Sequence, residues 1–151
     1  MNSNQLRKKL KSNRITRRFF LDVYAVDQLP YKKLRKSTWL LICNCCPAHL
    51  PGQHWIALFK KKNRIDVFDS FGQSPSAYGI DEFLNRQKLK VVYNSTTLQS
   101  MLTDVCGEYC LYFTYHRSRG ESMRTIVKRL KNLKSDRDTI VQTQAVNLYK
   151  L

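Results

Sequence analysis

The stretch that decides the fold is HWIALFKKKNRIDVFD, residues 54–69. Its two ends are rich in aromatic and aliphatic side chains, which is typical of β-strands, and its centre is a run of four polar residues, 60–63. A polar connection of this length between two such strands is common in β-hairpins. The stretch therefore predicts a hairpin, and the pairing of its strands determines which side chains meet.

Pairing of Phe59 with Arg64 would place His54 directly opposite Asp69. Directly opposed residues have Cβ atoms about 4.5–5.5 Å apart, close enough for the carboxylate to hold the imidazole. A slip of one residue would separate the two side chains, because successive residues of a strand point to opposite faces. The alternative is an ordinary surface pair or a structural histidine. The same register places four apolar residues on the face that carries the pair: Ile56, Leu58, Ile65 and Val67.

A second motif, Cys106-Gly107, begins a predicted helix, for which Thr103 or Asp104 could be the N-terminal cap. A thiol in the first turn lies at the positive end of the helix dipole, which favours the thiolate. A nearby imidazole would complete an activated nucleophile, and Gly107 would leave space beside the sulfur for a substrate backbone. The helix is indicated by residues that recur at helical spacing: Cys106, Tyr109, Cys110 and Phe113.

Gln99 lies seven residues before Cys106, in a loop that follows a strand-like segment, 90–93. Its amide could donate a hydrogen bond to a developing oxyanion, with the backbone N–H of Cys106 as the second donor. Imidazole, carboxylate, carboxamide and thiol are together the parts of a cysteine-nucleophile acyl-transfer site. Each residue alone also has a structural explanation, and for Cys110 we adopt that explanation, inert packing on an apolar helix face.

The rest of the sequence predicts an α+β protein in which a mixed, largely antiparallel sheet packs against helices, with the active site where the two layers meet. We expect residues 1–151 to form a single domain and residues 1–18 to be a basic, mobile N-terminal arm, with helical character through Leu6 and Leu10. Other elements are expected at these positions: a buried strand at 39–43, a helix at 81–88, a helix opened by Ser122 with a basic face, and a last helix capped by 135–138.

The charge of the chain is strongly positive. It has 27 Lys and Arg against 11 Asp and Glu, for a net charge of +16. Such an excess predicts attraction to polyanions. The basic residues are dispersed and no zinc-finger or RNA-recognition signature accompanies them, so we expect sequence-nonspecific DNA binding. The alternative is a generally cationic, solvated surface.

The five cysteines indicate a reducing compartment, because their number is odd and no export signal is present. We therefore expect an intracellular protein that is not secreted, and the absence of a long apolar run predicts no membrane partner. The segment 43–46, CNCC, resembles part of a metal site, and His49 could be recruited to it. No second Cys/His pair follows at zinc spacing, so a strand with Cys43 and Cys45 on one face is favoured and no metal is expected.

These motifs, in this order, resemble the adenovirus-type cysteine protease (adenain) family, and most closely the proteases of Maverick/Polinton elements and adintovirus-like viruses. That family shares a clan with the ubiquitin-like-protein (SUMO) proteases. The resemblance covers roughly residues 19–120. It is carried, together with Gln99, by four segments: FLDVYAVDQLP at 20–30, PGQHW at 51–55, FDSFG at 68–72 and CGEYC at 106–110.

The resemblance implies a role for each site residue: His54 as general base, Asp69 as its orienting acid, Gln99 in the oxyanion hole and Cys106 as nucleophile. It implies an endopeptidase that processes viral or transposon capsid and core precursors in the virion and host nucleus. It also implies DNA and a virion-derived activating peptide, tethered through a cysteine, as partners. No cofactor is required for the chemistry, and we expect a monomer.

Two other functions remain open at this point. One is a SUMO-type protease that removes ubiquitin-like modifiers by the same chemistry. The other is a basic DNA-binding protein without enzymatic activity, built on a decayed protease scaffold.

Overall fold

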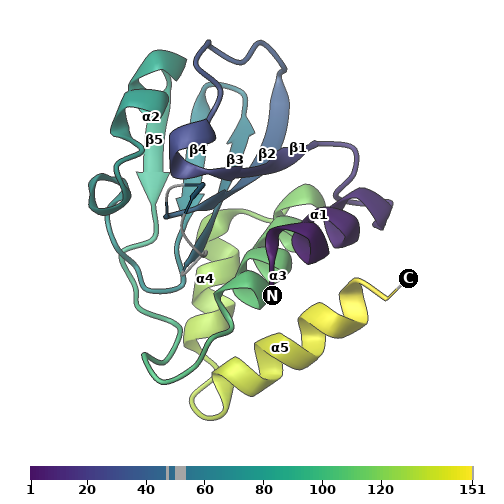
Figure 1. Ribbon diagram of the computed structural model, residues 1–151. Coiled ribbons are helices and arrows are strands. Elements are labelled where there is room, and N and C mark those ends of the chain that lie inside the picture. Colours follow the sequence, from purple (N-terminus) through teal and green to yellow (C-terminus); the bar gives the residue numbers. More distant parts are fainter. Residues whose placement is uncertain (47, 50–53, 151) are drawn as a thin grey trace.

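The computed structural model in Figure 1 describes residues 1–46, 48–49 and 54–150, in which a five-stranded sheet is surrounded by helices. The strands, in their order across the sheet, are β1 (Phe20–Ala25), β2 (Thr38–Asn44), β3 (Trp55–Lys61), β4 (Arg64–Phe68) and β5 (Lys90–Tyr93). The helices are α1 (Ser3–Ser12), α2 (Asp81–Gln87), α3 (Cys106–Ser118), α4 (Met123–Lys131) and α5 (Arg137–Leu148), with 3₁₀ turns η1 (Val26–Gln28) and η2 (Pro75–Tyr78).

The sheet is mixed, as the sequence predicts. β3 pairs antiparallel with β2 and with β4, whereas the two outer pairs, β1–β2 and β4–β5, are parallel. The antiparallel character that we expected for most of the sheet is thus confined to its central strands. The α+β class is confirmed.

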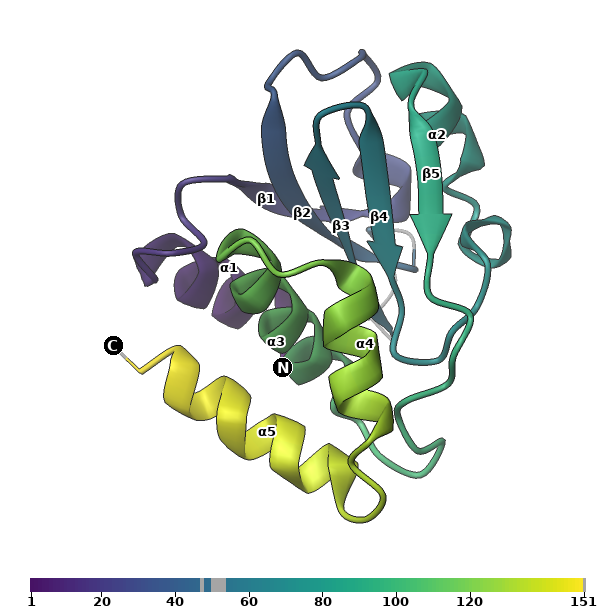
Figure 2. The same ribbon diagram turned by 180° about the vertical axis from the view of Figure 1, so that it is seen from behind.

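Helices cover both faces of this sheet. α1, α3, α4 and α5 lie on one side, while α2 and η1 lie on the other (Figures 1 and 2). The central strands are buried on both faces, so alternate residues of β2 enter different cores: Leu40 and Ile42 face α3, and Trp39 and Leu41 face α2. This explains the unbroken apolar run of that strand.

The hairpin is present, but the register that we predicted is wrong by two residues. Lys61 pairs with Arg64 and Phe59 with Asp66, so the turn is the two residues 62–63 rather than four. Lys62 adopts a left-handed conformation, with φ 56°, which makes this tighter turn possible. A shift of two residues leaves every side chain on its predicted face. The apolar face of the hairpin is therefore as expected: Ile56, Leu58, Ile65 and Val67 share one core cluster.

The N-terminal residues are also placed differently from our prediction. α1 carries Leu6 and Leu10, whose side chains are fully buried in the same core as α3. The helical character is confirmed, but this packing contradicts a mobile arm. The helical spacing of the two leucines was the sequence signal for this packing. The many basic residues around them favoured a solvated arm instead.

Two helix caps were predicted near the C-terminus. Ser122 begins α4 as expected, because its side chain accepts a hydrogen bond from the Thr125 N–H. The last helix, α5, begins within residues 135–138 as expected, with Asp136 at the N-cap, but Asp136 has φ 52° and makes no side-chain cap bond.

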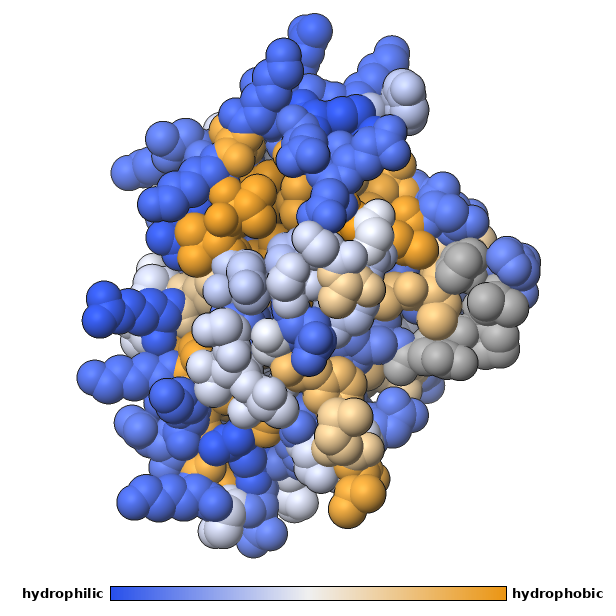
Figure 3. Space-filling view, turned by 90° about the vertical axis from the view of Figure 1, so that its left-hand side faces the viewer, coloured by the Kyte–Doolittle hydropathy of each residue, from blue (hydrophilic) through white to orange (hydrophobic). Residues whose placement is uncertain are grey.

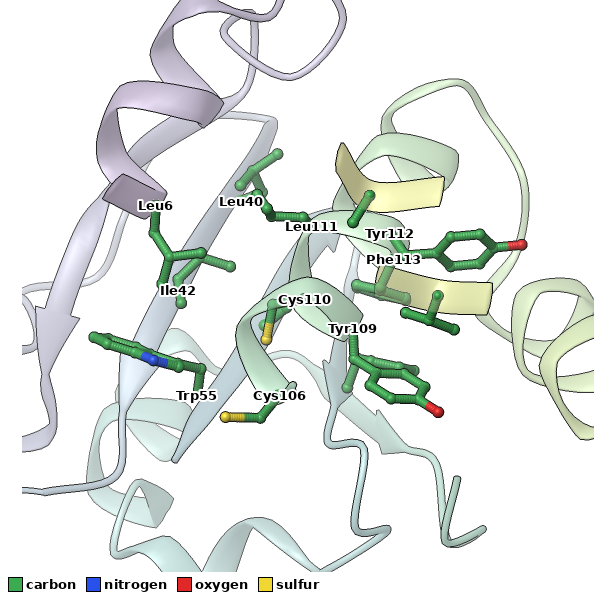
Figure 4. Close-up of a cluster of buried hydrophobic side chains, with 14 of the residues drawn as sticks. Leu6, Leu40, Ile42, Trp55, Cys106, Tyr109, Cys110, Leu111, Tyr112 and Phe113 are labelled. Carbon is green, nitrogen blue, oxygen red and sulfur yellow. The ribbon is translucent and has the colours of Figure 1, made fainter. Parts of the chain in front are cut away.

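α3 is the helix that fixes the candidate nucleophile relative to the sheet. Its inner face is buried, and Phe113 stacks on Phe68 of β4 with ring centroids 4.5 Å apart. Figure 4 shows Cys106 at the start of this helix near Trp55, with Cys110 one turn further along. Within the described part of the chain, no helix is both long and apolar enough to cross a membrane.

Candidate active site

His54 and Asp69 are in contact, although the ladder does not pair them. Nε2 of His54 lies 2.6 Å from Oδ1 of Asp69, and both side chains are buried. The β3–β4 ladder ends at the pair Ala57–Phe68, so both residues lie beyond it, and the imidazole also stacks on Phe71 with ring centroids 4.7 Å apart. The His54–Asp69 contact is therefore made just past the paired part of the hairpin. The observed register differs from the predicted one by two residues, and such a shift keeps both side chains on the same face. The predicted contact therefore exists although the predicted register was wrong.

Asp69 is held by several donors besides His54. Its Oδ2 accepts hydrogen bonds from the Tyr78 hydroxyl at 2.5 Å and from the Gln73 N–H at 2.8 Å, and its Oδ1 accepts one from the Phe71 N–H at 3.0 Å. A buried carboxylate is stable only when its oxygens are satisfied in this way. Asp69 is thus fixed as an anion that faces the imidazole.

Asn94 holds the backbone of the same residue. Its Oδ1 accepts from the Asp69 N–H at 2.8 Å, and its Nδ2 donates to the Asp69 carbonyl at 2.6 Å. Asn94 is the first residue after β5, and Asp69 is the first residue after β4. Because these neighbouring strands are parallel, their carboxyl ends meet at one edge of the sheet.

Cys106 is the first residue of α3, so its position at a helix N-terminus is confirmed. The predicted cap is wrong, since the residue before the helix is Val105, without a side-chain cap bond. Thr103 donates its hydroxyl hydrogen toward Asp138 and Ser100 instead. The space beside Gly107 is not open, because a Cβ there would lie 3.3 Å from the Cβ of Met1.

The second ring nitrogen of His54 and the Cys106 thiol are the remaining parts of the candidate site. Nδ1 of His54 is buried and has no hydrogen-bond partner among the described residues, and Cys106 is close enough to influence the pKa of His54. Nε2 of the imidazole is thus occupied by the Asp69 carboxylate, and Nδ1 is left for a second partner, for which the Cys106 thiol is the candidate.

The pKa of His54 reflects both neighbours. Burial opposes the charged imidazolium, but the hydrogen bond to Asp69 and the Cys106 thiol outweigh burial and raise the pKa to about 9. Burial acts against the ionised carboxylate of Asp69 as well, yet the hydrogen bonds from His54 and Tyr78 hold its pKa below the usual range. Burial raises the pKa of Cys110 well above that of an ordinary thiol, which suits a packing role.

Gln99 is buried and oriented from both ends of its amide. Its Oε1 accepts a hydrogen bond from the Ser70 hydroxyl at 2.6 Å, and its Nε2 donates to the Thr103 carbonyl at 2.9 Å. The Gln99 and Leu98 N–H groups also donate to the Ser70 carbonyl. Ser70 follows Asp69 directly, so one short segment positions both the acid and the amide. One N–H of the Gln99 amide has no protein partner among the described residues.

The sequence reasoning missed three positioning residues: Ser70, Tyr78 and Asn94. Asn94 could have been found from the parallel pairing of the strands that precede it and Asp69. Tyr78 lies in η2, nine residues after Asp69, and carried no sequence signal. Of the motif at 51–55, the segment Pro51-Gly52-Gln53 lies outside the described residues.

No protein-family model and no curated protein sequence matches the chain. Solved structures share its fold. The ASFV pS273R protease matches with a TM-score of 0.69 and 18% identity, over 99% of this chain and 67% of that one. The central domain of the uncharacterized Lpg1148 protein from Legionella pneumophila matches with a TM-score of 0.57 and 14% identity, over 98% and 97% of the chains. The SUMO protease Ulp1 matches with a TM-score of 0.50 and 13% identity, over 97% and 78%.

At these identities the comparisons establish the fold. The predicted resemblance is confirmed to this extent: the chain has the fold of the ASFV pS273R protease and of Ulp1. The adenain and Maverick assignments remain predictions, as do the roles of the four site residues.

The His54–Asp69 contact predicts a pH-dependent effect of Asp69→Asn. Burial lowers the pKa of the imidazole, and the Asp69 carboxylate counteracts this effect. Without the carboxylate, the pKa of His54 should fall from about 9 to 6.5 or lower. A folded-state pKa above the unfolded value of about 6.5 gives stability that is fully present below that pH and is lost as the pH rises through about 9. The stability difference between wild type and Asp69→Asn should therefore be largest below pH ~6.5 and shrink by about 3 kcal/mol by pH ~10.

NMR titration of the imidazole protons measures the pKa, with His54→Gln to assign the resonance among the three histidines. Urea unfolding at each pH gives the stability. The substitution Gln73→Asn is a conservative control, because Gln73 contacts Asp69 through its backbone N–H, which the substitution retains. An unchanged His54 pKa in Asp69→Asn would contradict the proposed electrostatics.

Proposed function

We propose that the chain is a cysteine protease in which Cys106 is the nucleophile. The observation that carries this proposal is the state of His54, which is bonded to buried Asp69 through Nε2, has no partner at Nδ1 among the described residues, and has its pKa raised by Cys106 as well as by Asp69. The raised pKa of His54 favours an imidazolium beside the sulfur, which is the charged form of an activated cysteine–histidine pair.

The reaction follows from these positions. The thiolate of Cys106 attacks the peptide carbonyl carbon, and a C–S bond forms as the carbonyl π electrons move to oxygen. His54 then gives its proton to the leaving amine, the C–N bond breaks and a thioester remains. Water loses a proton to His54 and attacks the thioester, which releases the acid and restores the thiol. Asp69 keeps the imidazole in its orientation throughout.

Gln99 supports the oxyanion in this scheme. Ser70 and the Thr103 carbonyl fix its amide, so the free N–H needs no reorganisation when charge develops on the substrate oxygen. The backbone N–H of Cys106, at the first turn of α3, is the second donor.

For the substrate class we propose an endopeptidase that processes viral or transposon capsid and core precursors. This rests on the adenain-like motifs and agrees with the fold shared with the ASFV pS273R protease. Action in the virion and host nucleus, and activation by a virion-derived peptide, belong to the same proposal. The second candidate is a protease specific for ubiquitin-like modifiers, which is favoured by the fold shared with the SUMO protease Ulp1.

Cys106→Ala should lower the rate of peptide cleavage by about 10³-fold or more, because no other group in the scheme can form the acyl-enzyme. The measurement is mass spectrometry of a proteome-derived peptide library before and after incubation. The matched control is Cys46→Ala, another free cysteine that is partly exposed, which should cleave at the wild-type rate. Retained activity in Cys106→Ala, with circular dichroism unchanged, would place the nucleophile elsewhere.

The same preparations separate the two substrate classes. Cleavage of capsid precursors without cleavage of SUMO- or ubiquitin-linked reporters supports the first proposal. Rapid cleavage of the reporters alone would replace it with the second.

We also propose that α4 contributes to nonspecific DNA binding. Arg124, Lys128 and Lys131 are exposed on one side of this helix and line the same hollow against β5. The face of the molecule in Figure 3 has hydrophilic side chains projecting into solvent around areas of apolar surface. Lys and Arg contacts to phosphates release counterions, which makes the affinity strongly dependent on salt.

Replacement of Arg124, Lys128 and Lys131 by alanine should weaken duplex DNA binding. It should also make the negative slope of the logarithm of the binding constant against the logarithm of the salt concentration shallower by about 3. Fluorescence anisotropy at several salt concentrations measures it. A triple alanine variant at Lys32, Lys33 and Arg35, three exposed basic residues elsewhere, is the control. Equal effects of the two triple variants would favour a generally cationic surface, and a salt-independent affinity would contradict the electrostatic account.

A further inference from the structure

The turn between Gln99 and Cys106 exposes two adjacent apolar side chains. Met101 is 80% exposed and Leu102 is 96% exposed. Among the described residues, no other two large hydrophobic residues that are this exposed are neighbours in the sequence. Figure 3 shows that apolar surface reaches solvent on one face of the molecule in several separate areas, so an exposed side chain alone is ordinary. Adjacent exposed residues beside a candidate active site require a more specific explanation.

The turn is held rigidly, so the exposure does not come from a loose loop. Asp138, in the first turn of α5, accepts hydrogen bonds from the Ser100 N–H at 3.1 Å and from the Thr103 hydroxyl at 2.6 Å. Its other oxygen accepts one from the Tyr109 hydroxyl of α3 at 2.7 Å. Within the turn, the Leu102 N–H donates to the Ser100 hydroxyl oxygen at 3.2 Å. Asp138 thus joins both ends of the turn to two helices.

The turn is also continuous with the candidate site. Gln99 precedes it and bonds to the carbonyl of Thr103, its last residue. A hollow of about 490 Å³ borders the two ends of the turn and is lined in part by Gln99, Ser100, Thr103 and Asp138. Because Gln99 belongs to the candidate site and directly precedes the turn in the chain, a polypeptide bound by the Gln99 amide would pass near the turn.

We infer that Met101 and Leu102 contact an apolar side chain of the protein substrate close to the scissile bond. The inference rests on the proposed protease function and adds a specificity to it. Fixing the turn in advance lowers the entropy cost of binding, and a flexible thioether beside a leucine can fit apolar side chains of different shape. Asp138 is a positioning residue for this contact and does not touch the substrate.

The test is a double variant, Met101→Ser with Leu102→Ser, compared with wild type on the same peptide library. The catalytic efficiency kcat/KM for cleavage sites with an apolar residue near the scissile bond should fall by about 10-fold or more, mainly through KM, and the preference for such sites should weaken. Val146→Ser is the matched control, because Val146 is also apolar and half exposed but lies on α5 away from the turn. Val146→Ser should leave both kcat/KM and the preference for apolar cleavage sites unchanged.

Alkylation of Cys106 by iodoacetamide separates a lost substrate contact from a damaged site. The rate should be the same in wild type and in the double variant. A slowed rate would mean that the turn supports the nucleophile, and it would overturn the inference. Unchanged specificity in the double variant, with wild-type cleavage intact, would overturn the inference and leave the protease proposal standing. Absence of any cleavage by wild type would overturn both the protease proposal and this inference. If wild type formed dimers in analytical ultracentrifugation and the double variant did not, the turn would be assigned to self-association instead.

Discussion

The buried carboxylate of Asp69 is the group on which the geometry of the candidate site depends. Its two oxygens accept four hydrogen bonds, from His54, Tyr78 and the backbone N–H groups of Phe71 and Gln73. A charge removed from water is tolerated only with such compensation, so the segment after β4 must curl around the carboxylate. That curl stacks Phe71 on the imidazole. The orientation of the candidate base is thus a consequence of satisfying one buried anion.

The sheet edge explains how distant parts of the chain meet. Parallel pairing of β4 with β5 brings Asn94 to the backbone of Asp69, and the next residue, Ser70, binds the Gln99 amide. The loop from Gln99 then leads into α3, whose stacking on β4 fixes where Cys106 lies. Sheet and helix layers converge at this edge, and each contributes part of the site.

The sequence was most informative where alternation or helical spacing determines a face. The strands at 54–59 and 64–69, the helix at Cys106 and the His54–Asp69 contact were predictable on these grounds. The register was not, because a left-handed Lys62 permits a turn two residues shorter than the polar run indicates. The side-chain bonds of Tyr78 and Asn94 depend on tertiary placement that local patterns do not encode.

The central claim is that His54 activates the Cys106 thiol, and alkylation across pH tests it most directly. Wild type and His54→Ala would be treated with iodoacetamide from pH ~5 to ~9, and modification of each cysteine would be followed by mass spectrometry. Selective labelling of Cys106 below the ordinary thiol pKa of about 8.5, lost in His54→Ala, is the predicted result. Equal, slow labelling of Cys106 in both proteins at every pH would contradict the account.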